Sequence, residues 1–338
     1  MNLYGRWMEI WERKLTMRDR HRQIFPFSWG LDWITDQKLI AGDPLAFFES
    51  WSARTLADSE DFFAVPEIED CSFKNGRLTF TTPTPSPFDE NNRFACQLYP
   101  TPGARTAVVV IPQWNAREES HVGLCQIIQK LGMTAARVTL PYHEERCPLE
   151  NKRADYMVSP NLGRTVHAIR QAVLEVRQLV RWLLDRRYRK IGLVGTSIGS
   201  CIGYLAFAHD REIQTAVFNH VSAYFADVVW TGLSTRYVQW GLEGNIKLPA
   251  LRACWAPLSP WYYVDRLEDS YRPHLLITAK YDLTFLPELG KPLIQRYEDS
   301  NLPINQKELP CGHYTTAHFP FKYLDGWYIC RHLRNELG

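Results

Sequence analysis

Short apolar runs alternate with amphipathic segments along most of the chain after residue 70. The runs at 106–111, 134–140, 190–194 and 275–279 are rich in aliphatic residues, as strands buried on both faces are. The segments between such runs place apolar residues at helical spacing, over 120–131, 165–187, 200–208, 287–299 and 322–336. This alternation predicts an α/β fold whose mostly parallel sheet is covered by helices on both faces.

The other segments have patterns of their own. Residues 71–82 and 93–99 predict an initial antiparallel pair of strands, with the Pro- and Asn-rich segment 83–92 between them. Further strands are expected at 214–218 and 306–310. Residues 221–270 form an insertion rich in Trp and Tyr. We therefore divide the chain into an aromatic helical extension over 1–70 and an α/β domain over 71–338 that carries this insertion.

The N-terminal extension begins with an aromatic helix. Its apolar residues fall at helical spacing: Tyr4, Trp7, Met8, Trp11 and Leu15. One interpretation is a helix that lies on a membrane surface. The other is a helix that packs its aromatic face on the α/β domain, and we favour it because Glu9 and Glu12 dilute the basic face.

Composition excludes several classes of protein. The chain has 39 basic and 37 acidic residues, a net charge of +2, which gives no reason to expect a nucleic-acid partner. Its eight cysteines form no C-x-x-C and no spacing typical of a zinc site, so neither a metal nor a cofactor is expected. Residues 1–22 lack the apolar stretch of a signal peptide, and no run approaches a membrane span. We expect a cytoplasmic protein.

The pentapeptide Gly195-Thr196-Ser197-Ile198-Gly199 is the strongest chemical signal. It is a G-x-S-x-G motif between a predicted strand and a predicted helix, the context in which a sharp turn exposes a nucleophilic serine. A serine hydroxyl needs a neighbouring base, and the base needs an orienting partner. Asp282 follows the strand at 275–279, and His313 follows the strand at 306–310. Because parallel strands end at the same edge, these side chains should meet.

In this order of serine, acid and histidine, residues 71–338 resemble the α/β-hydrolase superfamily, in particular its esterase-like group. The resemblance implies that fold, with a cap-like insertion at about 221–270. It implies Ser197 as nucleophile, His313 as base and Asp282 as its partner. His318 is the rival base, and Asp265 is a rival acid that no strand precedes.

The resemblance also implies two backbone donors for the oxyanion that forms during acyl transfer. One is the N–H of Ile198, directly after the nucleophile. The other lies in the loop 111–116, which is similar to the His-Gly turn of the family but has Pro112-Gln113 at that place. By this alignment Trp114 supplies the second donor. Gln113 tolerates left-handed backbone geometry less well than glycine does.

Three more residues are candidates for contact with substrate. His143 and Arg146 lie in a loop whose Pro-x-His pattern resembles that of related esterases, and a solvated polar loop is the alternative. His220 follows the strand at 214–218, and a hydrogen-bonded loop histidine is the alternative.

The predicted function is cleavage of a small-molecule carboxylic ester through an acyl-serine intermediate. A thioesterase, a peptidase or an acyltransferase would use the same three residues, and a hydrolase-like scaffold without catalysis is the non-enzymatic alternative. The aromatic residues of the insertion either line an apolar substrate pocket or form the insertion's own core.

Overall fold

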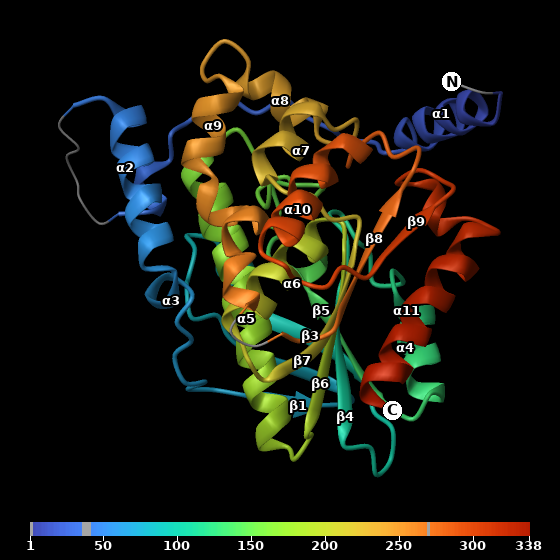
Figure 1. The fold of residues 1–338 in the computed structure, drawn as a ribbon. Coiled ribbons are helices and arrows are strands. Elements are labelled where there is room, and N and C mark those ends of the chain that lie inside the picture. Colours follow the sequence, from blue (N-terminus) through green and yellow to red (C-terminus); the bar gives the residue numbers. More distant parts are fainter. Residues whose placement is uncertain (1–2, 36–41, 269–270) are drawn as a thin grey trace.

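The computed structural model describes residues 3–35, 42–268 and 271–338. Residues 1–2 and 36–41 of the predicted extension and residues 269–270 of the predicted insertion lie outside the described residues. Figure 1 shows a central twisted sheet with helices on both of its faces. The prediction of a mostly parallel α/β fold is confirmed.

Nine strands form one sheet in the order β1-β2-β3-β5-β4-β6-β7-β8-β9. Their bounds are Ser72–Lys74, Arg77–Thr81, Arg93–Tyr99, Thr106–Ile111, Thr134–Thr139, Lys190–Thr196, Ile213–Asn219, His274–Ala279 and Gln306–Leu309, for β1 to β9. Strands β1, β2 and β3 pair in antiparallel fashion, β3 is antiparallel to β5, and every pair from β5 to β9 is parallel. The chain passes to opposite sides of β4 to make β5 and β6, so the strand order reverses there. Sites form at such a point.

The alternation of side chains along buried strands produces two cores. On β4, Val109 and Ile111 join the core beneath α5 (Leu162–Asp185) and α6 (Ile198–His209). Val108 and Val110 join the opposite core, beneath α4 (Val122–Lys130) and α11 (Phe321–Leu337). Helix α10 (Pro287–Asp299) packs on the first face. Because both faces are covered, β4 is aliphatic from residue 107 to its end.

One predicted strand is wrong in its extent. Residues 71–82 were expected as a single strand, but they form the hairpin of β1 and β2. Asn75 and Gly76 make the turn, with φ of 52° and 76°. Two consecutive left-handed residues suit the twist of a two-residue hairpin, and Asn-Gly is its favoured sequence. The pairing of β2 with β3 agrees with the expected antiparallel pair.

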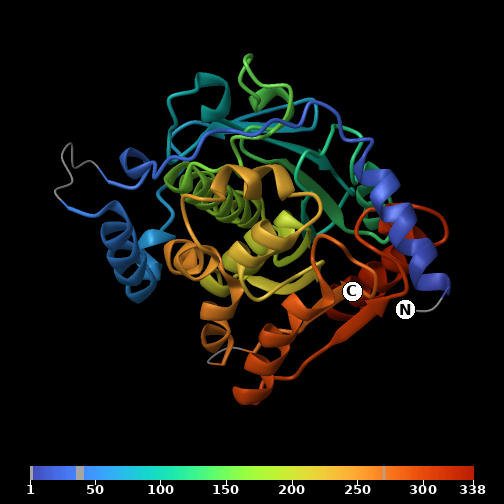
Figure 2. The same cartoon turned by 90° about the horizontal axis from the view of Figure 1, so that it is seen from above.

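The insertion lies at the end of the sheet where the parallel strands finish. The insertion contains α7 (Phe225–Thr231), α8 (Arg236–Leu242) and α9 (Leu248–Cys254), which Figure 2 shows lying over the sheet. Helices α2 (Pro44–Ala57) and α3 (Ser59–Phe62) flank it, and Ser52 donates a hydrogen bond to the carbonyl of Cys254 at 2.6 Å. Helix α1 (Leu3–Thr16) lies at the opposite side, beyond β9.

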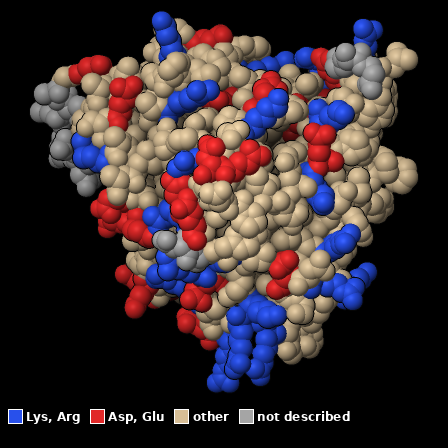
Figure 3. Space-filling view, viewed as in Figure 1, with Lys and Arg blue, Asp and Glu red and all other residues tan. Residues whose placement is uncertain are grey.

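Charge is distributed without a dominant sign. Figure 3 shows basic and acidic side chains interspersed on this face, with one group of Lys and Arg at the lower end, where α5 finishes. Among the helices of the described residues, none is long and apolar enough to cross a membrane.

Candidate active site

Ser197 lies in a strained turn between β6 and α6. Its backbone has φ 59° and ψ −120°, and its N–H donates to the carbonyl of Asn219 at 2.8 Å. The flanking glycines permit this turn because a Cβ on Gly195 would lie 2.1 Å from the carbonyl oxygen of Gly199, and one on Gly199 would lie 2.3 Å from that of Ile111. A non-glycine residue at positive φ stores strain that is common at functional sites.

Asp282 is buried at the end of β8 and has four hydrogen-bond donors around its carboxylate. Its Oδ1 accepts the backbone N–H groups of Thr284 at 2.7 Å and Phe285 at 2.8 Å. Its Oδ2 accepts Nδ1–H of both His220, at 2.8 Å, and His313, at 3.0 Å. Burial alone would raise the pKa of Asp282, but His313 and the imidazole donors hold that pKa well below its ordinary value.

The order of the strands explains why two histidines meet one carboxylate. Strands β7, β8 and β9 are neighbours, and His220, Asp282 and His313 each follow one of them. The acid therefore lies between the histidines, whose ring centroids are 4.6 Å apart. Burial lowers the pKa of His220, and a charge on His313 lowers it further. Burial opposes the charged form of His313 too, but Asp282 outweighs it and raises the pKa of His313.

His313 is the more accessible of the two histidines. Its side chain is 13% exposed, against 2% for His220. Phe285 stacks on it with ring centroids 5.4 Å apart and planes 2° from parallel. Among the described residues, the Ser197 hydroxyl makes no hydrogen bond to His313. The structure thus brings Asp282 and His313 into contact, and within the described part of the chain no hydrogen bond joins Ser197 to this pair.

Glu12 of α1 fixes the loop that carries His313, a contact that the sequence analysis missed. Its buried carboxylate accepts the backbone N–H groups of Tyr314 at 3.0 Å and Thr315 at 2.7 Å. Tyr4, about two helical turns before Glu12, donates its hydroxyl proton to the carbonyl of Pro310 at 2.5 Å. The sequence predicts that Glu12 dilutes a basic surface, but the structure places its side chain in the interior.

The loop after β4 is held by His143. The Nδ1 of His143 lies 2.8 Å from the carbonyl of Pro141, so it carries the proton, and Nε2 accepts the N–H of Asn115 at 2.8 Å. Burial lowers the pKa of His143 to about 4, which keeps this neutral form. Asn115 has φ 58°, so the left-handed residue of this loop is Asn115 and not Gln113. Asparagine tolerates that conformation better than most residues.

Trp114 is anchored through its side chain. Its Nε1–H donates to the carbonyl of Ala154 at 2.8 Å, and the N–H of Ala154 donates to Oδ1 of Asn115 at 3.0 Å. These two bonds tie the loop to Ala154, in addition to its bond to His143. A loop with three such ties presents its backbone in one fixed geometry.

The structure does not bring Arg146 to the candidate site. Its guanidinium is fully buried and pairs with Glu175 at 2.6 Å. It also donates to the carbonyls of Asn91 and Thr139. The rival residues are likewise elsewhere: His318 packs its ring on Trp11, and Asp265 forms an ion pair with Arg296.

This architecture is similar to that of solved esterases and peptidases. The Pyrococcus furiosus esterase Pf2001 matches with a TM-score of 0.54 at 14% identity, over 81% of this chain and 98% of the esterase. The chain has the α/β-hydrolase fold. The Pyrococcus horikoshii acylaminoacyl peptidase matches with a TM-score of 0.56 at 11% identity, over 83% of this chain but only 43% of the peptidase. No protein-family model matches the chain, and no curated protein is similar to it in sequence.

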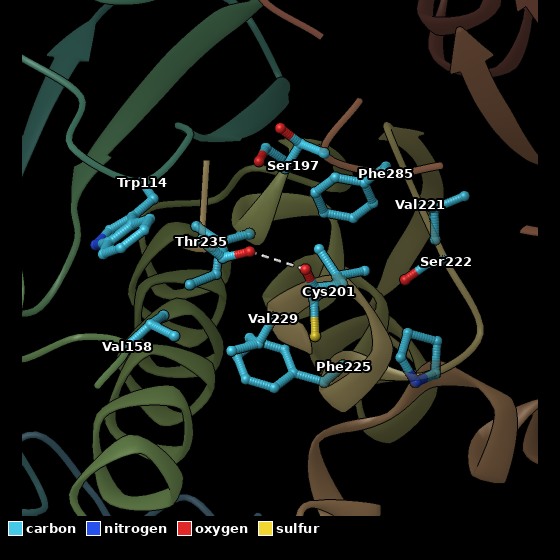
Figure 4. A pocket seen from close by; sticks show the side chains of 14 residues that line it. Trp114, Val158, Ser197, Cys201, Val221, Ser222, Phe225, Val229, Thr235 and Phe285 are labelled. Atoms are coloured by element: carbon cyan, nitrogen blue, oxygen red, sulfur yellow. Dashed lines mark hydrogen bonds between the residues drawn. The ribbon is translucent and has the colours of Figure 1, made fainter. Parts of the chain in front are cut away.

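A pocket opens beside Ser197 at the edge where α/β-hydrolase folds hold their sites. It encloses about 510 Å³ including its mouth, and its walls are mostly apolar. Figure 4 shows Ser197 and Phe285 at one end, Phe225 and Val229 at the other, and Trp114 along one side. Its lining residues are Trp114, Val158, Ser197, Ile198, Cys201, Val221, Ser222, Phe225, Val228, Val229, Thr235, Pro260, Thr284 and Phe285. His143, Arg146 and His220 are not among them.

The aromatic residues of the insertion divide between the wall of the pocket and the core shared with the rest of the domain. Phe225 lines the pocket, whereas Trp255 and Tyr263 are buried in the core of the domain. The aliphatic residues Val228 and Val229 of α7 line the pocket as well. The insertion thus contributes a wall of the pocket and part of the core of the domain.

Among the described residues, one group of three potential metal ligands lies close together, namely His220, Asp282 and His313. Their ligand atoms lie within 4.8 Å of one another. Both histidine Nδ1 atoms already donate to Asp282 Oδ2, and these hydrogen bonds account for the clustering.

Proposed function

We propose that the chain is a serine hydrolase that cleaves a carboxylic ester through an acyl-serine intermediate. The observation that carries this proposal is the hydrogen bond of Asp282 to Nδ1 of His313, at the sheet edge where the strained turn presents Ser197. With Nδ1 protonated, Nε2 of His313 is the nitrogen free to take a proton, as a general base for serine requires.

In this proposal His313 removes the hydroxyl proton as Ser197 Oγ attacks the ester carbonyl. The carbonyl oxygen becomes an oxyanion, which accepts the backbone N–H groups of Ile198 and Trp114. His313 returns the proton to the departing alcohol oxygen as the C–O bond breaks. Water then attacks the acyl-serine with His313 again as the base, which releases the acid and restores Ser197.

A fluorophosphonate probe tests the proposal directly, because it phosphonylates an activated serine. A scaffold that only binds ligands would not react, and lack of labelling would overturn the proposal. Thioesterase, peptidase and acyltransferase activity share the acyl-serine step. Turnover of a matched ester, thioester and amide with one acyl group, with and without an alcohol acceptor, separates these activities.

We expect the pocket to select the substrate by length. Phe225 lies at the far end from Ser197, so Phe225→Ala should extend the pocket and move the preferred acyl chain to a longer one. Each methylene that becomes buried contributes about 0.8 kcal/mol, roughly a fourfold gain in kcat/KM. The measurement is kcat/KM for p-nitrophenyl acetate to decanoate. Trp240→Ala is the matched control, because Trp240 is a half-exposed aromatic of the insertion outside the pocket lining. A length profile that Phe225→Ala leaves unchanged would contradict this role.

His220 is proposed as a positioning residue that sets the basicity of His313. A base must be neutral, so kcat/KM should rise as pH increases through the pKa of His313. In His220→Leu, Asp282 Oδ2 loses one of its two donors and should stabilise the His313 cation more strongly. The rise should move to higher pH by roughly half to one unit, given a net hydrogen bond of about 0.5–1.5 kcal/mol.

The substitution His220→Asn supplies the control for this prediction. Its Nδ2–H replaces Nδ1–H at nearly the same place, so the profile should stay at the wild-type position. Glu12 of α1 also faces His313 and remains in both variants. Coincident profiles for wild type and His220→Leu would show that His220 does not act on the base.

A further inference from the structure

Helix α1 has a second apolar face that the fold leaves uncovered. Met8 and Leu15 are buried toward the domain, but the packing interpretation is wrong for part of the aromatic face, because Tyr4 and Trp7 are 38% and 50% exposed. Leu3, Trp7, Ile10 and Met17 are at least half exposed, and their spacing places them together on another face of the helix. Large apolar side chains grouped on the outside of a protein mark an interaction site.

The start of α11 continues this surface. Phe319, Tyr323 and Trp327 are each at least half exposed, and the last two are one helical turn apart. Trp11 connects the two helices: its ring centroid lies 5.0 Å from that of Trp7 and 6.4 Å from that of Phe321. We call the exposed residues the α1–α11 surface, defined as Leu3, Trp7, Ile10, Met17, Phe319, Tyr323 and Trp327.

The charges that flank the α1–α11 surface are almost all positive. Its exposed basic neighbours are Arg6, Arg13, Lys14, Lys322 and Arg331. Lys322 and Arg331 lie over the rings of Tyr323 and Trp327 at 5.0 and 5.1 Å. The acidic residues of α1 are Glu9, which pairs with Arg13 at 2.8 Å, and Glu12, whose side chain is buried. On α11 before Arg331 the acid is Asp325, which accepts a hydrogen bond from Asn219 at 2.9 Å.

We propose that the α1–α11 surface docks on an anionic lipid layer. Tryptophan and tyrosine favour the boundary between water and acyl chains, and flanking cations attract acidic headgroups. A second copy of the chain fits less well, because a two-fold interface would set the same cations against each other. Docking requires no movement of α1, whose inner face is already packed.

The location of this surface connects it to the candidate site. Figures 1 and 2 place α1 at the rim of the molecule, beyond β9. The inner face of α1 carries Glu12 into the loop that follows His313. A lipid layer at the outer face would therefore lie beside the edge of the sheet that holds Ser197, Asp282 and His313. The proposed docking does not depend on the proposed ester hydrolysis.

Vesicle flotation tests the docking with the full chain. Wild type should float with vesicles of phosphatidylcholine that contain one third phosphatidylserine, and less with pure phosphatidylcholine. The double variant Trp7→Ser, Ile10→Ser should lower the partition coefficient by at least about tenfold, because two large side chains lose their burial. Lys14→Gln should lower it by about fivefold on the anionic vesicles alone.

The controls separate docking from folding. Trp240→Ser removes an equally exposed tryptophan from the insertion and should float like wild type. Circular dichroism and the melting temperature of the double variant should match those of wild type. Failure of wild type to float with anionic vesicles would overturn the proposal, as would equal flotation of the double variant. A wild-type dimer that the double variant lacks would assign the surface to a second copy and overturn it too.

Discussion

Replacement of Ser197 with Ala is expected to abolish fluorophosphonate labelling and to lower kcat for a p-nitrophenyl ester by about 10⁴–10⁶-fold. The change removes only one oxygen, and alanine differs little from serine in its tolerance of the strained turn. The next hydroxyl along α6, that of Ser200, is already engaged in a hydrogen bond. The Oγ of Ser200 lies 2.7 Å from the carbonyl oxygens of both Ser197 and His220, one of which accepts its single proton.

Ser222→Ala provides the matched control for this experiment. Ser222 also lines the pocket, so its loss removes a hydroxyl from the same cavity without touching the turn. This variant should label at close to the wild-type rate. Labelling of Ser197→Ala at the wild-type rate, or loss of labelling only in Ser222→Ala, would refute Ser197 as the nucleophile.

The fold could be predicted because its signals are local. The aliphatic runs of β4 and β6 and the amphipathic pattern of α5 reflect burial that each segment experiences along its own length. The apolar pattern on either side of Asn75-Gly76 predicts one continuous strand, but the structure forms the hairpin of β1 and β2 there. The wrong extent of this predicted strand therefore concerns its turn residues, whose preference for a hairpin is present in the sequence.

The neighbourhood of Asp282 was harder to foresee. The sequence indicates that His220, Asp282 and His313 follow strands, but only the strand order places the acid between the two histidines. His220 was therefore expected at the substrate, and the structure directs its Nδ1 to Asp282. Glu12 is more than 300 residues from the loop it holds, and no local pattern distinguishes it from a solvated helix residue.

The four donors around Asp282 lead to the second large prediction. In Asp282→Asn, one side of the amide must face the N–H groups of Thr284 and Phe285, which cannot change their protonation. The amide oxygen should turn to them, so the NH₂ group faces Nδ1 of His220 and His313. Each ring then avoids a clash of donors by moving its proton from Nδ1 to Nε2.

This change of tautomer should lower kcat by about 10⁴-fold, because a protonated Nε2 of His313 has no lone pair for the proton of Ser197. Fluorophosphonate labelling should slow by a similar factor but still reach completion, since the nucleophile remains. In the double variant with Ser197→Ala, the second change should add little further loss, as residues that act as one unit do. Labelling of Asp282→Asn at the wild-type rate, or full additivity in the double variant, would mean that Asp282 does not orient His313 for catalysis. His220→Asn is the control, because it also introduces an asparagine into the contact between His220 and Asp282. It leaves the Asp282 carboxylate intact and keeps an N–H donor toward it.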